Sequence, residues 1–128
     1  MTVAYVDTSC MVAIAFGENG AEALARRIEG YSEIVSSNLL EAEFRSALAR
    51  EEVADDGGLL SGMSWIFPDR RLTAEFQRVL AARQLRGADL WHLATALYLA
   101  ESPGDIHFLT VGSAQRNTAA MLGFPTPI

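Results

Sequence analysis

Short apolar runs alternate along this chain with longer segments whose apolar residues recur at helical spacing. Residues 3–6 form an apolar run that ends at Asp7 and predicts a buried strand, and residues 34–37 and 106–110 predict two more. Helices are predicted over about 8–17, 20–30, 38–52, from 73, over 89–100 and over 113–122. Several helices for each strand predict an α/β fold of three layers, α/β/α, with a central parallel sheet.

Three segments are harder to assign. Residues 55–58 predict a break in the pattern, and residues 124–126 a short segment at the sheet edge. Residues 59–67 are apolar but interrupted by glycine, and we interpret them as a short helix followed by a loop that faces a partner. Trp65 and Phe67 in that stretch suit a partner surface or the core equally well. With no repeat and no linker, residues 1–128 are expected to form one domain.

The composition narrows the class of protein. Ten positive and sixteen negative residues give a net charge of −6, which argues against coating nucleic acid by bulk electrostatics. All ten positive residues are arginine, which suits bidentate phosphate contacts, although a bias in the genome towards Arg and Ala explains it as well. The only cysteine, Cys10, predicts a buried thiol in a reducing cytoplasm, and no run spans a membrane.

Three carboxylates from distant segments are candidates for chemistry. Asp7 ends the first strand, where parallel sheets place ligand sites, but it also suits the start of a helix beside Thr8. Asp89 opens an almost entirely apolar helix and suits capping of that helix. In the helix from residue 38, Glu41 fits a capping box with Asn38 as N-cap, whereas Glu43 has no such structural role. Together they suit a hard divalent cation.

Four segments in this order resemble the sequence blocks of PIN-domain toxins of the VapC type. The four segments are Val6-Asp7-Thr8-Ser9, Ser36 to Glu43 (SSNLLEAE), Leu85 to Ala96 (LRGADLWHLATA), and Phe108-Leu109-Thr110 with Ala119 to Phe124 (AAMLGF). The resemblance covers essentially the whole chain and implies a PIN-like three-layer fold. It also implies that Asp7, Glu43 and Asp89 form an acidic catalytic site for Mg²⁺ or Mn²⁺, with Glu43 favoured over Glu41 by the register from Ser36.

The same resemblance implies a biological role. Such a protein would be a metal-dependent endoribonuclease that hydrolyses RNA, in a type II toxin–antitoxin pair. A small VapB-like antitoxin would cover its groove through a C-terminal segment, and the toxin would be a cytoplasmic homodimer. Among the arginines, Arg86 is our first candidate for contacting the RNA backbone.

One position departs from the family pattern. A fourth acid usually stands two residues after the threonine of the last strand, but here Thr110 is followed at that distance by Gly112. Ser113 is the nearest polar residue and fits a helix N-cap better than a ligand. The alternative hypothesis is therefore a weakened or inactive PIN-like module that binds RNA or a protein. His92 suits packing or hydrogen bonding better than general-base catalysis. The remaining alternative is an unrelated α/β domain whose acids only cap helices.

Overall fold

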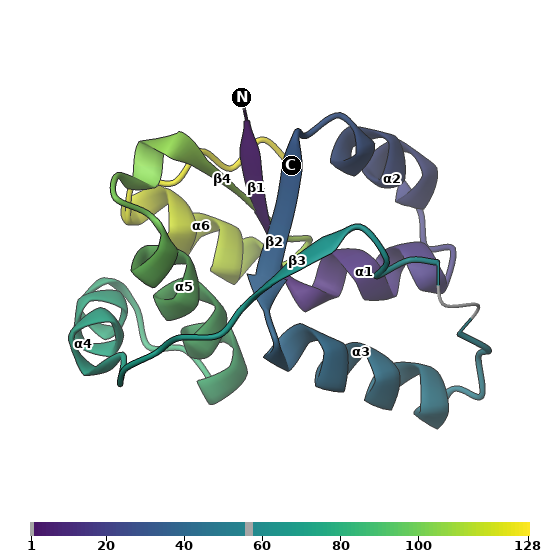
Figure 1. The fold of residues 1–128 in the computed structure, drawn as a ribbon, viewed down its shortest axis with the longest axis horizontal. Coiled ribbons are helices and arrows are strands. Elements are labelled where there is room, and N and C mark those ends of the chain that lie inside the picture. The colour runs from purple at the N-terminus through teal and green to yellow at the C-terminus, as the bar shows by residue number, and fades with distance from the viewer. Residues whose placement is uncertain (1, 56–57) are drawn as a thin grey trace.

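A sheet of four parallel strands lies at the centre of the computed structural model, which describes residues 2–55 and 58–128 (Figure 1). Met1 and the Asp56-Gly57 part of the expected break lie outside the described residues. The strands are β1 (Val3–Val6), β2 (Glu33–Ser37), β3 (Met63–Ile66) and β4 (Ile106–Leu109). Their spatial order is β3-β2-β1-β4, and every neighbouring pair is parallel.

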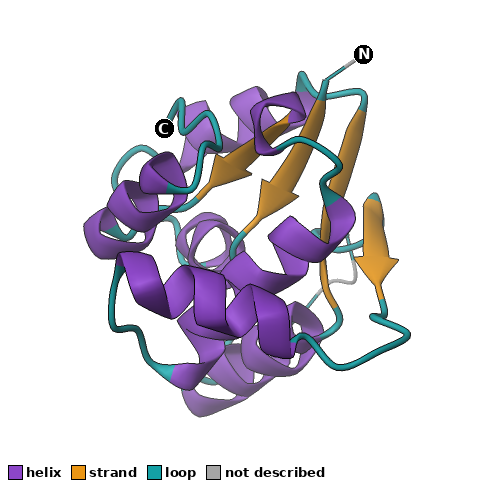
Figure 2. Ribbon diagram, turned by 90° about the vertical axis from the view of Figure 1, so that its left-hand side faces the viewer, coloured by secondary structure: helices purple, strands orange, loops and turns teal. Residues whose placement is uncertain are grey.

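Helices cover both faces of this sheet. Helices α1 (Thr8–Ala15), α2 (Ala21–Glu29) and α3 (Leu39–Arg50) lie on one face. Helices α4 (Thr73–Ala82), α5 (Gly87–Leu99) and α6 (Ser113–Met121) lie on the other, and a 3₁₀ turn, η1 (Pro103–Asp105), precedes β4 (Figures 1 and 2). The predicted three-layer α/β/α fold with a parallel sheet is therefore confirmed. None of the helices in the described part of the chain has the length and apolar character needed to cross a bilayer.

The two apolar cores follow from the alternation of side chains along the strands. In β1, Tyr5 packs into the core beneath α5 and α6, whereas Ala4 and Val6 pack into the core beneath α1 and α3. Helix α5 is buried over His92–Leu97, as expected for a helix that is apolar almost all round. Cys10 is fully buried, and burial, with the nearby charge of Asp7, raises the pKa of its thiol to about 12.

The interpretation of residues 59–67 as a helix and loop was wrong. Residues 63–66 form the edge strand β3, which pairs with β2 from Ile34↔Met63 to Ser37↔Ile66. The strand is short and glycine precedes it directly, so its alternation is too brief to stand out in the sequence. Trp65 is partly buried beside the core, whereas Phe67, just beyond β3, has 66% of its surface exposed.

Two smaller expectations also need correction. Asn38 has helical backbone angles and makes no capping bond. Instead, the Ser37 hydroxyl accepts a hydrogen bond from the Leu39 N–H at 3.0 Å. The C-terminal edge segment makes one backbone hydrogen bond to the sheet among the described residues, from the Phe108 N–H to the Pro125 carbonyl at 2.9 Å. Proline has no N–H to donate, so a regular ladder does not continue there.

The strand order creates a switch point between β1 and β4. From β1 the chain proceeds outward to β2 and then β3, whereas β4 adds on the opposite side of β1. Open parallel sheets form ligand-binding crevices at the carboxyl ends of the strands beside such a reversal. Asp7 directly follows β1 and Thr110 directly follows β4, so both lie at this position.

Candidate active site

Asp7 is the most firmly held of the three predicted acids. Its carboxylate is 8% exposed, and Oδ2 accepts hydrogen bonds from the hydroxyls of Ser9 and Thr110, both at 2.8 Å. Each hydroxyl has one proton and donates it to Asp7. The oxygens of Ser9 and Thr110 lie 3.2 Å apart, but neither has a proton left to donate to the other. No hydrogen bond from the described residues reaches Oδ1, which leaves one oxygen of Asp7 for a ligand.

Glu43 is anchored by a different pair of side chains. Its Oε1 accepts a hydrogen bond from the Thr8 hydroxyl at 2.7 Å and lies 2.8 Å from Nε2 of His92. Partial burial opposes ionisation, but the bonds from His92 and Thr8 outweigh it and hold the pKa of Glu43 below its usual value. Glu41 is exposed and pairs with Arg45 at 3.0 Å. Glu43 therefore faces Thr8 and His92, whereas Glu41 faces solvent and Arg45.

The hydrogen-bond partners of His92 determine where its proton lies. Thr8 gives its proton to Glu43, so the 2.8 Å contact between Glu43 and Nε2 requires a proton on that nitrogen. On the other side, Nδ1 lies 2.7 Å from the hydroxyl of Tyr5, which itself accepts the Ser37 N–H at 3.2 Å. Burial raises the pKa of Tyr5 strongly, so the phenol keeps its proton and can donate it to Nδ1. A neutral imidazole protonated at Nε2 satisfies this chain of bonds.

Asp89 approaches from the opposite layer and is held more loosely. It lies in the first turn of α5, whose N-cap is Arg86, so Asp89 is not the capping residue. Its side chain is 35% exposed, and its nearest cation is Nη2 of Arg86 at 3.9 Å. Partial burial raises the pKa of Asp89 above its usual value, the charge of Asp7 adds to this, and Arg86 offsets part of it. The three acids therefore share one electrostatic environment.

The donor set suits a hard cation, although the ligands are not drawn together. Within residues 2–55 and 58–128, no three His, Cys, Asp or Glu side chains form a ready-made metal cluster. Asp7, Glu43 and Asp89 nevertheless each retain a carboxylate oxygen that accepts no hydrogen bond from the described residues. Mg²⁺ commonly keeps several water ligands and takes only one or two carboxylates directly. The residues present thus fit Mg²⁺ or Mn²⁺ with water completing the coordination.

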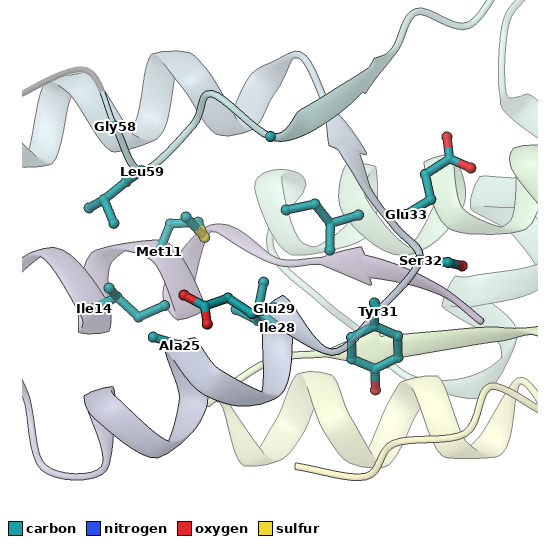
Figure 3. Close-up of a pocket in the computed structure, with 12 residues that line it drawn as sticks. Met11, Ile14, Ala25, Ile28, Glu29, Tyr31, Ser32, Glu33, Gly58 and Leu59 are labelled. Atoms are coloured by element: carbon teal, nitrogen blue, oxygen red, sulfur yellow. The ribbon is translucent and has the colours of Figure 1, made fainter. Parts of the chain in front are cut away.

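A separate apolar cavity lies near the amino ends of the strands. It has a volume of about 360 Å³ and is bounded by α1, α2, the start of β2 and the loop before β3 (Figure 3). Met11, Ile14 and Ile28 contribute apolar walls, and Glu29 and Tyr31 contribute polar groups. None of the three predicted acids lines it. This cavity is therefore distinct from the acidic site.

Comparison with known proteins agrees with this architecture. The family model of the PIN domain matches residues 4–119, which include all three acids and Gly112. The chain belongs to the PIN domain family. A solved structure with a similar fold is VapBC-1 from nontypeable Haemophilus influenzae, with a TM-score of 0.65 over 96% of both chains. Sequence identity is 15%, so this likeness concerns the fold. No curated protein matches the sequence.

Several supporting residues of this PIN domain were missed or misjudged from sequence. Thr8 and Ser9, at the start of α1, donate hydrogen bonds to Glu43 and Asp7. The role of Tyr5 was missed, although a tyrosine in a buried strand signals a need for a polar partner. Thr110 gave a weaker signal, because its importance depends on β4 lying beside β1. Ser113 begins α6, and its hydroxyl makes no capping bond, since the N-cap is Gly112.

Proposed function

We propose that this PIN domain is a metal-dependent endoribonuclease and acts as a VapC-type toxin. The observation that carries the proposal is the charge interaction of Asp89 with Asp7 and Glu43 beside the switch point of the sheet, within a PIN family match. Their oxygens are ligands suited to Mg²⁺ or Mn²⁺. Such a cation, when bound, neutralises phosphate charge and lowers the pKa of a coordinated water.

The surrounding residues prepare the acids for this task. Ser9 and Thr110 hold Asp7 through Oδ2, which leaves Oδ1 without a hydrogen bond from the described residues and 3.9 Å from Nε2 of His92. Thr8 and His92 favour the ionised form of Glu43. Asp89 closes the site from α5 and is exposed enough to adjust to a ligand. The guanidinium of Arg86, 92% exposed and 3.9 Å from Asp89, would contact the phosphate backbone of RNA.

The direct test is RNA cleavage with Mg²⁺ or Mn²⁺ by the wild type and by Asp7→Asn, Glu43→Gln and Asp89→Asn. Each substitution keeps the side-chain shape but removes a charge, and we expect loss of at least about 100-fold in cleavage rate. Glu41→Gln is the matched control, because it makes the same change two residues away on the exposed side of α3. Equal activity in all variants would refute the catalytic assignment.

Gly112 supports a second candidate function, a PIN-like module with weak or no nuclease activity. Its φ is −83°, and a Cβ there would meet Thr110 Oγ1 at 3.6 Å and Gln115 Cβ at 3.8 Å, which are ordinary contacts. An aspartate therefore fits without strain. Cleavage that appears only in Gly112→Asp would favour the weakened module, whereas cleavage by the wild type would favour the toxin.

We further propose an antitoxin of the VapB kind as the partner, and a homodimer as the functional form in the cytoplasm. The fold shared with VapBC-1 supports this partner class. Co-purification with the product of an adjacent small gene, followed by a measurement of mass in solution, tests both points. A monomer that no such product binds or inhibits would contradict them.

A further inference from the structure

A half-buried tryptophan borders the acidic site from the same helix as Asp89. The indole Nε1 of Trp91 donates a hydrogen bond to Ser37 Oγ at 2.6 Å. Ser37 is the last residue of β2, so the ring is held at the carboxyl edge of the sheet, one strand from Asp7. A side chain anchored in this way presents a ring of fixed orientation beside the acids.

Two surface hollows are lined by the Trp91 ring. One, of about 260 Å³, lies at the start of α3 and includes Ala42, the neighbour of Glu43. The other, of about 600 Å³, lies between α5 and the segment that leads into α4. Both are lined by Trp91, so the indole borders two open spaces. The further lining residues used below are Arg71 and Phe76.

The larger hollow combines aromatic rings with an available cation. The ring of Phe76 lies 6.0 Å from that of Trp91, centroid to centroid, at an angle of 44°. Arg70 is bound to Glu75 at 2.6 Å and lies over Tyr98. Arg71 is exposed and makes no ion pair with the described part of the chain. Aromatic rings beside an arginine are the elements with which proteins bind single-stranded nucleic acid.

We propose that an unpaired base of the RNA substrate stacks on Trp91 while Arg71 contacts a neighbouring phosphate. This inference rests on the proposed ribonuclease function and names the residue that selects unpaired RNA. A net charge of −6 gives little general attraction for a duplex, so binding energy must come from local contacts. A paired base has both faces covered in the helix, whereas an unpaired one offers a face to the indole.

Binding is measured in chelator, where no metal-dependent cleavage interferes, with a short unstructured RNA and the same RNA annealed to its complement. The Trp65→Phe variant leaves Trp91 as the only tryptophan, and we expect the single strand to quench its fluorescence far more than the duplex does. Trp91→Leu should weaken binding about ten-fold, within the range found for loss of one stacked base. Arg71→Ala should reduce the salt dependence of binding by about one ion.

Two further variants separate stacking from the structural role of the indole. Trp91→Phe keeps an aromatic face but loses the bond to Ser37, and Ser37→Ala loses the bond but keeps the indole. Both should retain most of the affinity if stacking is responsible. Circular dichroism and thermal unfolding establish that each variant is folded, and Trp65→Phe should bind like the wild type.

The outcomes distinguish this inference from the proposed function. Unchanged affinity in folded Trp91→Leu, unchanged fluorescence at saturating RNA, or equal binding of duplex would overturn the stacking role even if cleavage is observed. Conversely, quenching and weakened binding without cleavage in any metal would uphold stacking and refute the nuclease. With an active enzyme, we expect Trp91→Leu to raise KM about ten-fold and to change kcat little.

Discussion

The two sides of the acidic site differ in how firmly the protein holds their carboxylates. On the side of β1 and α3, Asp7 and Glu43 each accept two short hydrogen bonds from buried or half-buried neighbours. On the side of α5, the carboxylate of Asp89 accepts none from the described residues and only approaches Arg86. One side is therefore prepared before a ligand arrives, and the other retains freedom to adjust. Such a division combines precise positioning with access for a large substrate.

Electrostatics follow the same division. Hydrogen bonds lower the pKa of Glu43 despite its partial burial, whereas the pKa of Asp89 is raised by burial and by the charge of Asp7. Folding therefore favours the ionised form of Glu43 and disfavours that of Asp89. The penalty at Asp89 is what a bound cation would relieve.

The largest expected effect on stability comes from replacing His92, which bonds to Glu43 on the side of the site with the firmly held carboxylates. Replacing His92 by Leu removes the partner of both Tyr5 and Glu43 in a fully buried position. We expect a loss of about 3 kcal/mol in the free energy of unfolding, because the buried hydroxyl of Tyr5 and the carboxylate of Glu43 each lose one of their two hydrogen-bond partners. Urea denaturation measures it. His107→Leu is the control, since His107 also bonds a tyrosine, Tyr31, at a less buried site. Equal losses in both variants would contradict a special role for His92.

An intermediate effect is expected at Thr110. Thr110→Val keeps the shape but removes the hydroxyl that donates to Asp7 and accepts the Gly112 N–H. The expected loss of stability is about 1–2 kcal/mol, because Thr110 is 1% exposed and water cannot replace the bonds. The exposed Thr73 provides a matched Thr→Val control, which should change stability by less than about 0.5 kcal/mol. A loss at Thr110 no greater than at Thr73 would indicate that its hydroxyl does not hold Asp7.

The smallest effect is on the melting temperature, and it has opposite signs for substitutions of Glu43 and of Asp89. At neutral pH, Glu43→Gln should lower the melting temperature and Asp89→Asn should raise it, because folding favours one charge and disfavours the other. Both shifts are small, since each side chain is about a third exposed.

Their pH dependence provides the check. The stability from Glu43 is present above its unfolded pKa and is lost as pH falls through its lower folded value. The penalty at Asp89 is full above its raised folded pKa and disappears as pH falls to the unfolded value of about 3.9. Differential scanning calorimetry between pH 7 and pH 3 should show both differences shrinking. If both substitutions shifted the melting temperature in the same direction at pH 7, folding would not favour the charge of Glu43 while disfavouring that of Asp89.

Much of this site could be anticipated from local pattern, and the limits are physical. Asp7 stood out because a carboxylate directly after a buried apolar run is costly unless it has a use or a partner. The preference for Glu43 over Glu41 came from family register, and the reason for it is visible only where Thr8 and His92 meet Glu43. Strand β3 was not predicted, because four residues at a sheet edge show too little alternation of apolar and polar side chains to identify a strand.

The sequence by itself determined the alternation of strands and helices, the buried character of α5, and the acids that end or open these elements. Those features depend on neighbours a few residues apart, where periodicity and chain geometry act directly. Only the tertiary structure decided that β4 lies beside β1, which brings Thr110 to Asp7, and that α5 packs against β2, which lets His92 reach Glu43. Those contacts join residues separated by 49 and 103 positions, and packing of the whole domain decides them.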